Sequence, residues 1–215
     1  MATGEPAELL QVLDADGVAT GETRSAEDVH AEGLWHGAVV VWVLRRDGGV
    51  LLRRNPRADP CAPLALGPTA RAHAGVGPPA AEAAAAAERQ LGIGARREGL
   101  SHLGTFRSER CRRGEGTSYV DREHQEAFVT WDDTPLEDLA LDPAEVDTVY
   151  EVPLERAVAL FESGAFVPAP GFDSMQRVSN ALLIEEDLPA AGREELLEQL
   201  RALTAFAAAG TSPSD

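Results

Sequence analysis

"AHAGVGPPAAEAAAAAERQLGIG", residues 72–94, opens with a glycine-rich turn and two prolines, continues in alanine, and stops at Leu91-Gly92-Ile93. Proline is tolerated in the first turn of a helix, and glycine is favoured just past the last turn. The pattern therefore predicts a helix from about Pro79 to Leu91. Alanine is the best helix former, but it leaves this helix almost bare of side chains that could carry chemistry.

Strong β-strand patterns precede this helix. The segment "AVVVWVLRRDGGVLLRR" (38–54) contains two β-branched runs joined at Asp47-Gly48-Gly49, which predicts a hairpin. Further upstream, "LLQVLDADGVATGETR" (9–24) predicts two short strands around Asp16-Gly17. Between these segments Ser25 has the features of a helix N-cap, and Gly33 those of a helix end.

The remaining segments complete a single domain. Residues 55–79 are rich in proline and glycine and predict an irregular bridge. The segments "GLSHLGTFRS" (99–108) and "YVDREHQEAFVTW" (119–131) predict strands separated by an arginine-rich loop. Residues 172–207 predict C-terminal helices with an apolar stripe at Leu196, Leu197, Leu200 and Leu203. No linker interrupts the chain, so residues 1–215 are expected to form one domain with a core at about 9–165.

Composition restricts the class of partner. The chain of 215 residues has a formal net charge of -17, which argues against nucleic acid and against an anionic membrane surface. It contains no lysine, so every fixed positive charge is an arginine, which suits phosphate and carboxylate ligands. We therefore expect a small-molecule ligand, and a homodimer could form through the leucine stripe. Two sparse cysteines, Cys61 and Cys111, favour a reducing, cytoplasmic location.

Six segments, taken in order, resemble the Nudix superfamily. They are "VHAEGLWHGAVVVWVLRRDGGVLLRR" (29–54), the bridge, the helix ending "LGI" (91–93), "LGTF" (103–106), "DREHQEAFV" (121–129) and "LALDPAEVDTVYEVPLERAVAL" (139–160). The resemblance is closest to the branch that contains type I isopentenyl diphosphate isomerase and its hydrolase relatives. It covers about residues 9–165 and implies an α/β (α+β) fold in which a mixed β-sheet is sandwiched between helices.

The catalytic signature of that superfamily is degenerate in this chain. The Nudix box is G-x5-E-x7-R-E-U-x-E-E-x-G-U, where U is a bulky aliphatic residue, and its glutamates bind Mg²⁺. When the final Gly-U is placed on Gly92-Ile93, the Arg-Glu pair falls on Ala85-Ala86 and the Glu-Glu pair on Arg89-Gln90. Because Mg²⁺ requires oxygen ligands, this helix cannot supply the usual site, and no cofactor is expected there.

A metal-free use of the cleft is the leading interpretation. His73 and Glu123 are the candidate catalytic residues, since histidine titrates near neutrality and a buried glutamate can be tuned upward. Alternation along a strand should turn His124 to the opposite face from Glu123. The candidate substrate-binding residues are Arg53, Arg54, Arg89 and Trp35, with Arg71 and Arg107 as further sources of anion contacts.

The alternative is a divalent metal centre. In the isomerase, histidines join two acidic residues around a metal, and the resemblance implies a matching ligand set of His30, His36, His73, Asp121 and Glu123. Imidazole and carboxylate together suit Zn²⁺, Mn²⁺ or Fe²⁺, and the cofactor of this alternative is a divalent metal, Mg²⁺, Mn²⁺ or Zn²⁺. The catalytic cysteine of the isomerase falls near Ala70 or Arg71, neither of which is a thiol, and Cys61 lies well upstream. Isomerase activity is therefore not expected.

Three functions follow from these patterns. The first is a divergent Nudix-fold protein that binds a small anionic metabolite and catalyses a non-hydrolytic acid/base reaction. The second is a hydrolase of nucleotide or prenyl diphosphates whose metal ligands have moved to Glu82, Asp121, Glu123 and Glu126. The third is a non-catalytic protein that senses a ligand or binds a partner.

Overall fold

The computed structural model describes residues 8–75, 77–95, 99–114 and 117–210, and it leaves the side chains of residues 111–118 undescribed. The N-terminal predictions are confirmed. Strands β1 (Leu9–Leu13) and β2 (Ala19–Ser25) pair antiparallel and lead into helix α1 (Ala26–Glu32). The Ser25 side chain accepts a hydrogen bond from the Asp28 backbone, and Gly33 ends the helix with a φ of 66° that suits glycine.

A long hairpin and a parallel strand form the centre of the sheet. The predicted hairpin is confirmed as β3 (Trp35–Leu44) and β4 (Gly49–Arg54). Strand β3 runs parallel to β8 (Thr117–Trp131), which pairs antiparallel with β7 (Ser101–Gly114). Strands β9 (Thr148–Pro153), β10 (Val167–Asp173) and β11 (Val178–Leu183) extend the sheet beyond β4. The eleven-stranded sheet of the described residues is therefore mixed, as expected.

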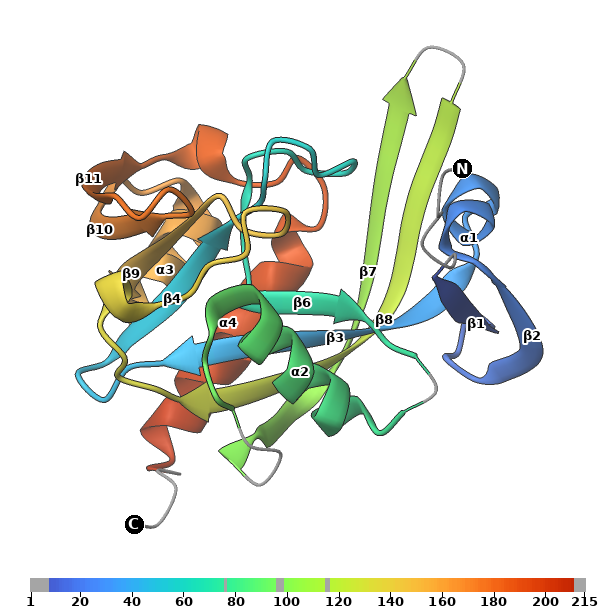
Figure 1. Ribbon diagram of the computed structural model, residues 1–215, viewed down its shortest axis with the longest axis horizontal. Coiled ribbons are helices and arrows are strands. Elements are labelled where there is room, and N and C mark those ends of the chain that lie inside the picture. The colour runs from blue at the N-terminus through green and yellow to red at the C-terminus, as the bar shows by residue number, and fades with distance from the viewer. Residues whose placement is uncertain (1–7, 76, 96–98, 115–116, 211–215) are drawn as a thin grey trace, which may run out of the picture.

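Helices cover both faces of this sheet (Figure 1). Helix α2 (Pro79–Leu91) packs Ala83, Ala87 and Leu91 against the β3 valines on one face. Helices α3 (Leu154–Ser163) and α4 (Arg193–Ala208) pack against the other face, where Trp42 is fully buried. Short 3₁₀ turns lie at Leu136–Asp138 and Glu185–Asp187. The predicted sandwich is thus confirmed, and the helix predicted at 79–91 has the predicted bounds.

Three local predictions were wrong. The bridge at 55–79 contains β5 (Leu66–Gly67) and β6 (Ala70–His73), because each finds a partner strand in the hairpin. The arginine-rich segment continues β7 rather than forming a loop. Within 172–207 only α4 is an α-helix, since residues 178–183 pair with β10 as a strand. No local pattern in the sequence reveals these pairings.

Most of the leucine stripe of α4 is packed against the core of the same chain. Leu200 and Leu203 are fully buried in the core beneath α4, and Leu196 and Leu197 pack against that core. The stripe therefore offers little surface to a second copy, and the homodimer stays a prediction. None of the helices in the described ranges is long and apolar enough to cross a membrane.

Candidate functional site

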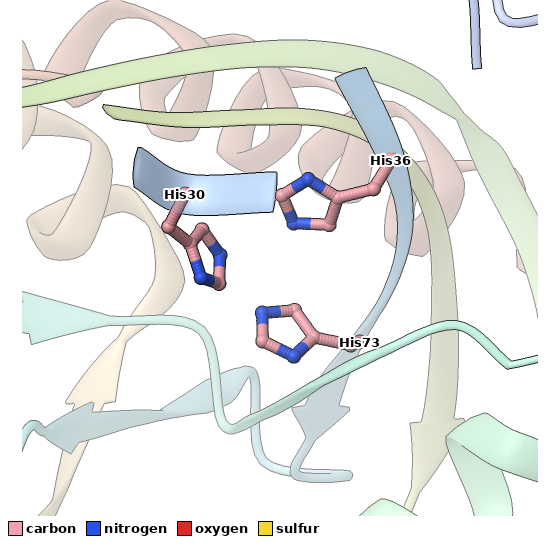
Figure 2. Close-up of side chains that lie close together, drawn as sticks. All are labelled: His30, His36 and His73. Carbon is pink, nitrogen blue, oxygen red and sulfur yellow. The ribbon is translucent and has the colours of Figure 1, made fainter. Parts of the chain in front are cut away.

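Three histidines from separate elements meet at one point (Figure 2). His30 lies in the last turn of α1, His36 follows at the start of β3, and His73 ends β6. Their ring centroids lie 5.0 to 5.1 Å apart. His30 and His36 are buried, whereas His73 is partly exposed. The cluster joins His30 to His73, which lie more than forty positions apart in the sequence.

Two carboxylates of β8 face these histidines. The parallel register places His36 opposite Glu123, and strand alternation puts Asp121, Glu123 and Gln125 on one face. His36 Nε2 lies 3.5 Å from Asp121 Oδ1 and 3.8 Å from Glu123 Oε1. His30 Nε2 lies 3.8 Å from the same Asp121 oxygen. The structure thus brings together all five residues of the predicted metal-ligand set.

Three converging atoms of this cluster are buried without hydrogen-bond partners. They are His30 Nε2, His36 Nε2 and Asp121 Oδ1. Burial lowers the pKa of His30 to about 4 and also lowers the pKa of His36, so both rings are neutral at pH 7. Buried polar groups are normally paired. Two overlapping groups, His30 with His36 and His73, and His36 with Asp121 and Glu123, each bring their ligand atoms within 4.8 Å of one another, which fits a divalent cation.

Arg71 contacts both carboxylates, at the Asp121 oxygen that does not face the histidines and at the same Glu123 oxygen that faces His36. Its Nη2 lies 2.8 Å from Asp121 Oδ2 and 2.5 Å from Glu123 Oε1. Arg110 donates to the same Asp121 oxygen. Burial opposes ionisation of Asp121, but the two guanidinium groups hold its pKa below the usual range. The pKa of Arg71 is raised, because the two carboxylates outweigh its burial.

A cavity of about 370 Å³ opens beside this cluster. Arg53, Arg71, Arg89 and Arg110 line it together with His73 and Tyr119. Arg53 is nearly fully buried, and burial lowers its pKa to about 10. It donates to Gln90 Oε1 at 3.0 Å and to Asn55 Oδ1 at 2.9 Å. The cavity therefore combines arginine donors with the histidine and carboxylate cluster.

The two candidate catalytic residues, Glu123 and His73, differ in how many of their polar atoms are already hydrogen-bonded. Glu123 Oε1 accepts from Arg71 and Oε2 accepts from Gln125 at 2.7 Å. Burial alone would raise the pKa of Glu123, but Arg71 reverses the effect and lowers it. The expected upward tuning of this glutamate was therefore wrong. His73 lines the cavity, and its Nδ1 lies 3.1 Å from Glu8 Oε2.

Several other predicted residues lie elsewhere. Arg54 pairs with Asp187 at 2.8 Å and lies outside the cavity lining. Trp35 also lies outside it, beneath the guanidinium of Arg107, whose carbon is 4.5 Å from the ring centroid. His124 packs against Trp35 on the opposite face of β8 from Glu123, as alternation predicted. The side chain of Cys111 lies outside the described residues.

Neither new acidic ligand of the relocated-hydrolase hypothesis reaches the cluster. Glu82 accepts from the backbone N–H groups of Gly75 and Gly77, at 2.7 and 2.9 Å, and so caps the loop before α2. Glu126 lies on the other face of β8 and pairs with His102 at 2.6 Å. The proposed joint use of Glu82 and Glu126 with Asp121 and Glu123 was wrong in this respect.

Helix α2 presents neutral or basic groups to the site. Gln90 is fully buried, and its Oε1 accepts from both Arg53 and the Arg71 backbone. Arg89 lines the cavity and pairs with Glu145 at 2.8 Å. Ala86 is also fully buried. Arg53 and Arg89, which were predicted to bind substrate, both line the cavity, and substrate binding by them stays a prediction.

The sequence offered the arginines of 110–113 as anion contacts and placed Gln125 on the polar face of Glu123, but it did not predict the contacts that Arg110, Gln90 and Gln125 make. Arg110 lies directly opposite Asp121 in the β7–β8 pairing. That cross-strand partnership would have been visible had residues 109–113 been assigned to a strand instead of a loop. Cys61 was judged too far upstream, yet its sulfur lies 3.8 Å from Asp121 Oδ2. The loop path that returns it to the site is set by tertiary structure.

Comparison with solved structures identifies the fold. The chain is similar to DR0079 from Deinococcus radiodurans, with a TM-score of 0.55, 15% identity and coverage of 73% of this chain and 90% of that one. It is also similar to a MutT protein from Methanosarcina mazei Go1, with a TM-score of 0.51, 13% identity and coverage of 79% and 95%. A Nudix hydrolase from M. smegmatis, RenU, is 15% identical over 95% of this chain and 98% of that one, with a TM-score of 0.49.

No family model matches the sequence, and no curated protein does. The architecture described above, a mixed sheet between helices with α2 after the β6 strand, is the Nudix fold. At such low identity the likeness concerns the fold, and activity has to be argued from the site.

Proposed function

We propose that this Nudix-fold protein binds a divalent metal through His30, His36, His73, Asp121 and Glu123 and uses it on a small anionic metabolite. The convergence of three unpartnered buried atoms, His30 Nε2, His36 Nε2 and Asp121 Oδ1, carries this proposal. A bound dication would supply Lewis-acid polarisation of a ligand oxygen. The choice of imidazole with carboxylate favours Zn²⁺ or Mn²⁺ over Mg²⁺.

The residues of the cavity define the class of ligand. Arg53 and Arg89 place guanidinium charge at the cavity, and guanidinium groups attract phosphate and carboxylate. A volume of about 370 Å³ is in the range of small-molecule sites. A phosphorylated or carboxylated metabolite is therefore the expected ligand. Tyr119 stacks on His30, with ring centroids 4.6 Å apart, and forms part of the same wall.

We further propose that the Nudix box of α2 no longer binds Mg²⁺. Gln90 uses its amide to hold Arg53, and Arg89 carries positive charge at the position of a box glutamate. The histidine and carboxylate set supports a relationship to the isomerase branch. A thiol is absent at positions 70 and 71, where Ala70 and Arg71 stand, so double-bond isomerisation is not proposed.

A metal-free reaction is the second candidate, and the ion pairs of Arg71 favour it. Arg71 supplies the positive charge that two buried carboxylates require, so Asp121 and Glu123 can remain ionised without a cation. His73 would then be the proton carrier, since it lines the cavity. Glu123 is a weak base in this setting because Arg71 lowers its pKa.

Metal content separates the two candidates. Purified protein is analysed by elemental mass spectrometry, and Zn²⁺ and Mn²⁺ are then titrated into metal-stripped samples by calorimetry. We expect roughly one metal per chain, and we expect loss of binding in His36→Ala. The matched control is His102→Ala, because His102 is half-exposed and pairs with Glu126 on the other face of β8. Absence of binding in wild type, or equal loss in both variants, would reject the metal centre.

Phosphate release from nucleoside and prenyl diphosphates tests the degenerate box in the same samples. We expect no release that depends on Mg²⁺. Sustained Mg²⁺-dependent turnover that survives His36→Ala would show that a different acidic site performs hydrolysis.

A further inference from the structure

The proposed metal ligands of this chain are already in contact with fixed positive charge. Asp121 Oδ2 accepts from both Arg71 and Arg110, and Glu123 Oε1 accepts from Arg71. Asp121 and Glu123 are 2% and 0% exposed, so water screens these pairs little. A dication that enters the cluster would therefore share its carboxylates with guanidinium groups.

The charges around the cluster are balanced before any metal enters. Two guanidinium groups, those of Arg71 and Arg110, contact the two carboxylates Asp121 and Glu123. Arg89 and Glu145 form their own pair at the wall, and Glu8 is largely exposed beside His73. Addition of a dication would leave this buried region with two uncompensated positive charges.

One arginine also has an unused donor. Arg53 is 5% exposed, and its Nε is buried without a hydrogen-bond partner, although both of its terminal nitrogens donate to side chains. Arg53 lines the same cavity as Arg71 and Arg110. Arg53 therefore keeps a buried cationic N–H unpaired beside the cavity, which is unfavourable.

We propose that the metal and a dianionic ligand bind to this site cooperatively, and that Arg71 imposes the coupling. The inference rests on the metal centre proposed above. A dication alone is opposed by Arg71 and Arg110, and an anion alone competes with Asp121 and Glu123 for the same arginines. Together they restore the charge balance, so each raises the affinity of the other. The coupling must be equal in both directions.

The same reasoning names the ligand chemistry. Two extra positive charges are matched by one phosphate-type dianion, whereas a monoanionic carboxylate would leave one charge uncompensated. The expected ligand therefore carries a phosphate monoester or an equivalent dianion, and acetate should couple less strongly than sulfate.

Binding of Mn²⁺ followed by electron paramagnetic resonance tests the coupling, because this method measures free Mn²⁺ directly. Sulfate serves as the dianion, since it matches the charge of a phosphate group, and acetate is the monoanion control. We expect saturating sulfate to raise Mn²⁺ affinity of the wild-type protein roughly tenfold, within the usual range of coupling between sites. Sulfate affinity, measured by calorimetry, should rise by the same factor when Mn²⁺ is present.

Arg71→Met should bind Mn²⁺ tightly without sulfate and should lose most of the coupling. Arg107→Met is the matched control, because Arg107 lies on the same strand as Arg110 but stacks over Trp35. It should retain the wild-type coupling. If Arg71→Met does not fold, Arg71→Lys keeps the charge and should keep a substantial part of the coupling.

The outcomes distinguish the two proposals. Wild-type protein that binds Mn²⁺ with the same affinity in sulfate, acetate and chloride would overturn the coupling and leave the metal centre intact. Protein that binds no Mn²⁺ or Zn²⁺ with any anion would overturn the metal centre and the coupling with it. Arg107→Met that behaves like Arg71→Met would assign the effect to general surface charge and would also overturn the role of Arg71.

Discussion

The Arg71→Met substitution should weaken the metal-free protein severely, and a divalent metal should restore it. Arg71 bridges Asp121 and Glu123 at 2.8 and 2.5 Å, and both carboxylates are almost completely buried. Removal of one partner from a buried ion pair costs about 3–5 kcal/mol, because an uncompensated charge is left behind. Arg110 still contacts Asp121, and Gln125 still contacts Glu123, so the lower half of that range is expected.

Thermal unfolding in EDTA measures this loss. For a chain of this size 1 kcal/mol corresponds to roughly 2–4 °C, so a loss of about 3–4 kcal/mol should lower Tm by about 6–16 °C. Zn²⁺ or Mn²⁺ should recover most of the difference, since the cation replaces the lost charge at both carboxylates. The control is Arg54→Met, which removes a partly exposed pair with Asp187 and should cost only about 1 kcal/mol, with no metal rescue. A stable Arg71→Met in EDTA, or equal losses in both variants, would refute the argument.

Three further predictions concern single groups. Glu82→Gln should lower the free energy of unfolding by about 1 kcal/mol in chemical denaturation, because it weakens the hydrogen bonds to Gly75 and Gly77. The affinity for Zn²⁺ should stay unchanged, and a loss of Zn²⁺ binding in this variant would instead show that Glu82 is a metal ligand. The metal-free protein should lose stability as pH falls from about 6.5 to 4, by up to about 3 kcal/mol from His30 alone, because the unfolded ring takes up a proton there and the folded ring does not. Denaturation midpoints that are flat over this range, or smaller losses in wild type than in His30→Ala, would contradict it. Cys61 of the folded protein should react slowly with iodoacetamide at pH 8, since burial raises its pKa to about 12. In the denatured protein the same residue should react fast, as peptide mapping would show. Equal reaction rates in the folded and unfolded protein would disprove this.

Local patterns predicted the parts of the fold that are decided locally. The helix at 79–91 was predictable because proline and glycine mark its ends, and the β3–β4 hairpin because Asp-Gly chemistry joins two β-branched runs. Residues 178–183 were not predictable in the same way. Their strand depends on pairing with β10, and neither helical nor strand periodicity dominates in that segment. Tertiary context overrides weak local propensity there.

The candidate site was predictable as a set of residue types and not as a set of contacts. The resemblance brought His30, His36 and Asp121 together correctly, since the order of segments fixes which strands adjoin. The role of Arg71 could not be found that way, because it depends on the distance from β6 to β8 across the sheet. Arg54 and Arg53 are neighbours in sequence, yet strand alternation sends only Arg53 into the cavity.

The neutral Gln90 of α2 and the arginines of the cavity are parts of one arrangement. Here Gln90 occupies the buried contact with Arg53, and its neutral amide accepts the hydrogen bond without cancelling the charge. A glutamate at this position would neutralise Arg53 and remove its attraction for an anion. The glutamine therefore leaves the positive charge of Arg53 in the cleft uncancelled, while the carboxylates that hold the opposite charge lie across the sheet on β8, next to the histidines.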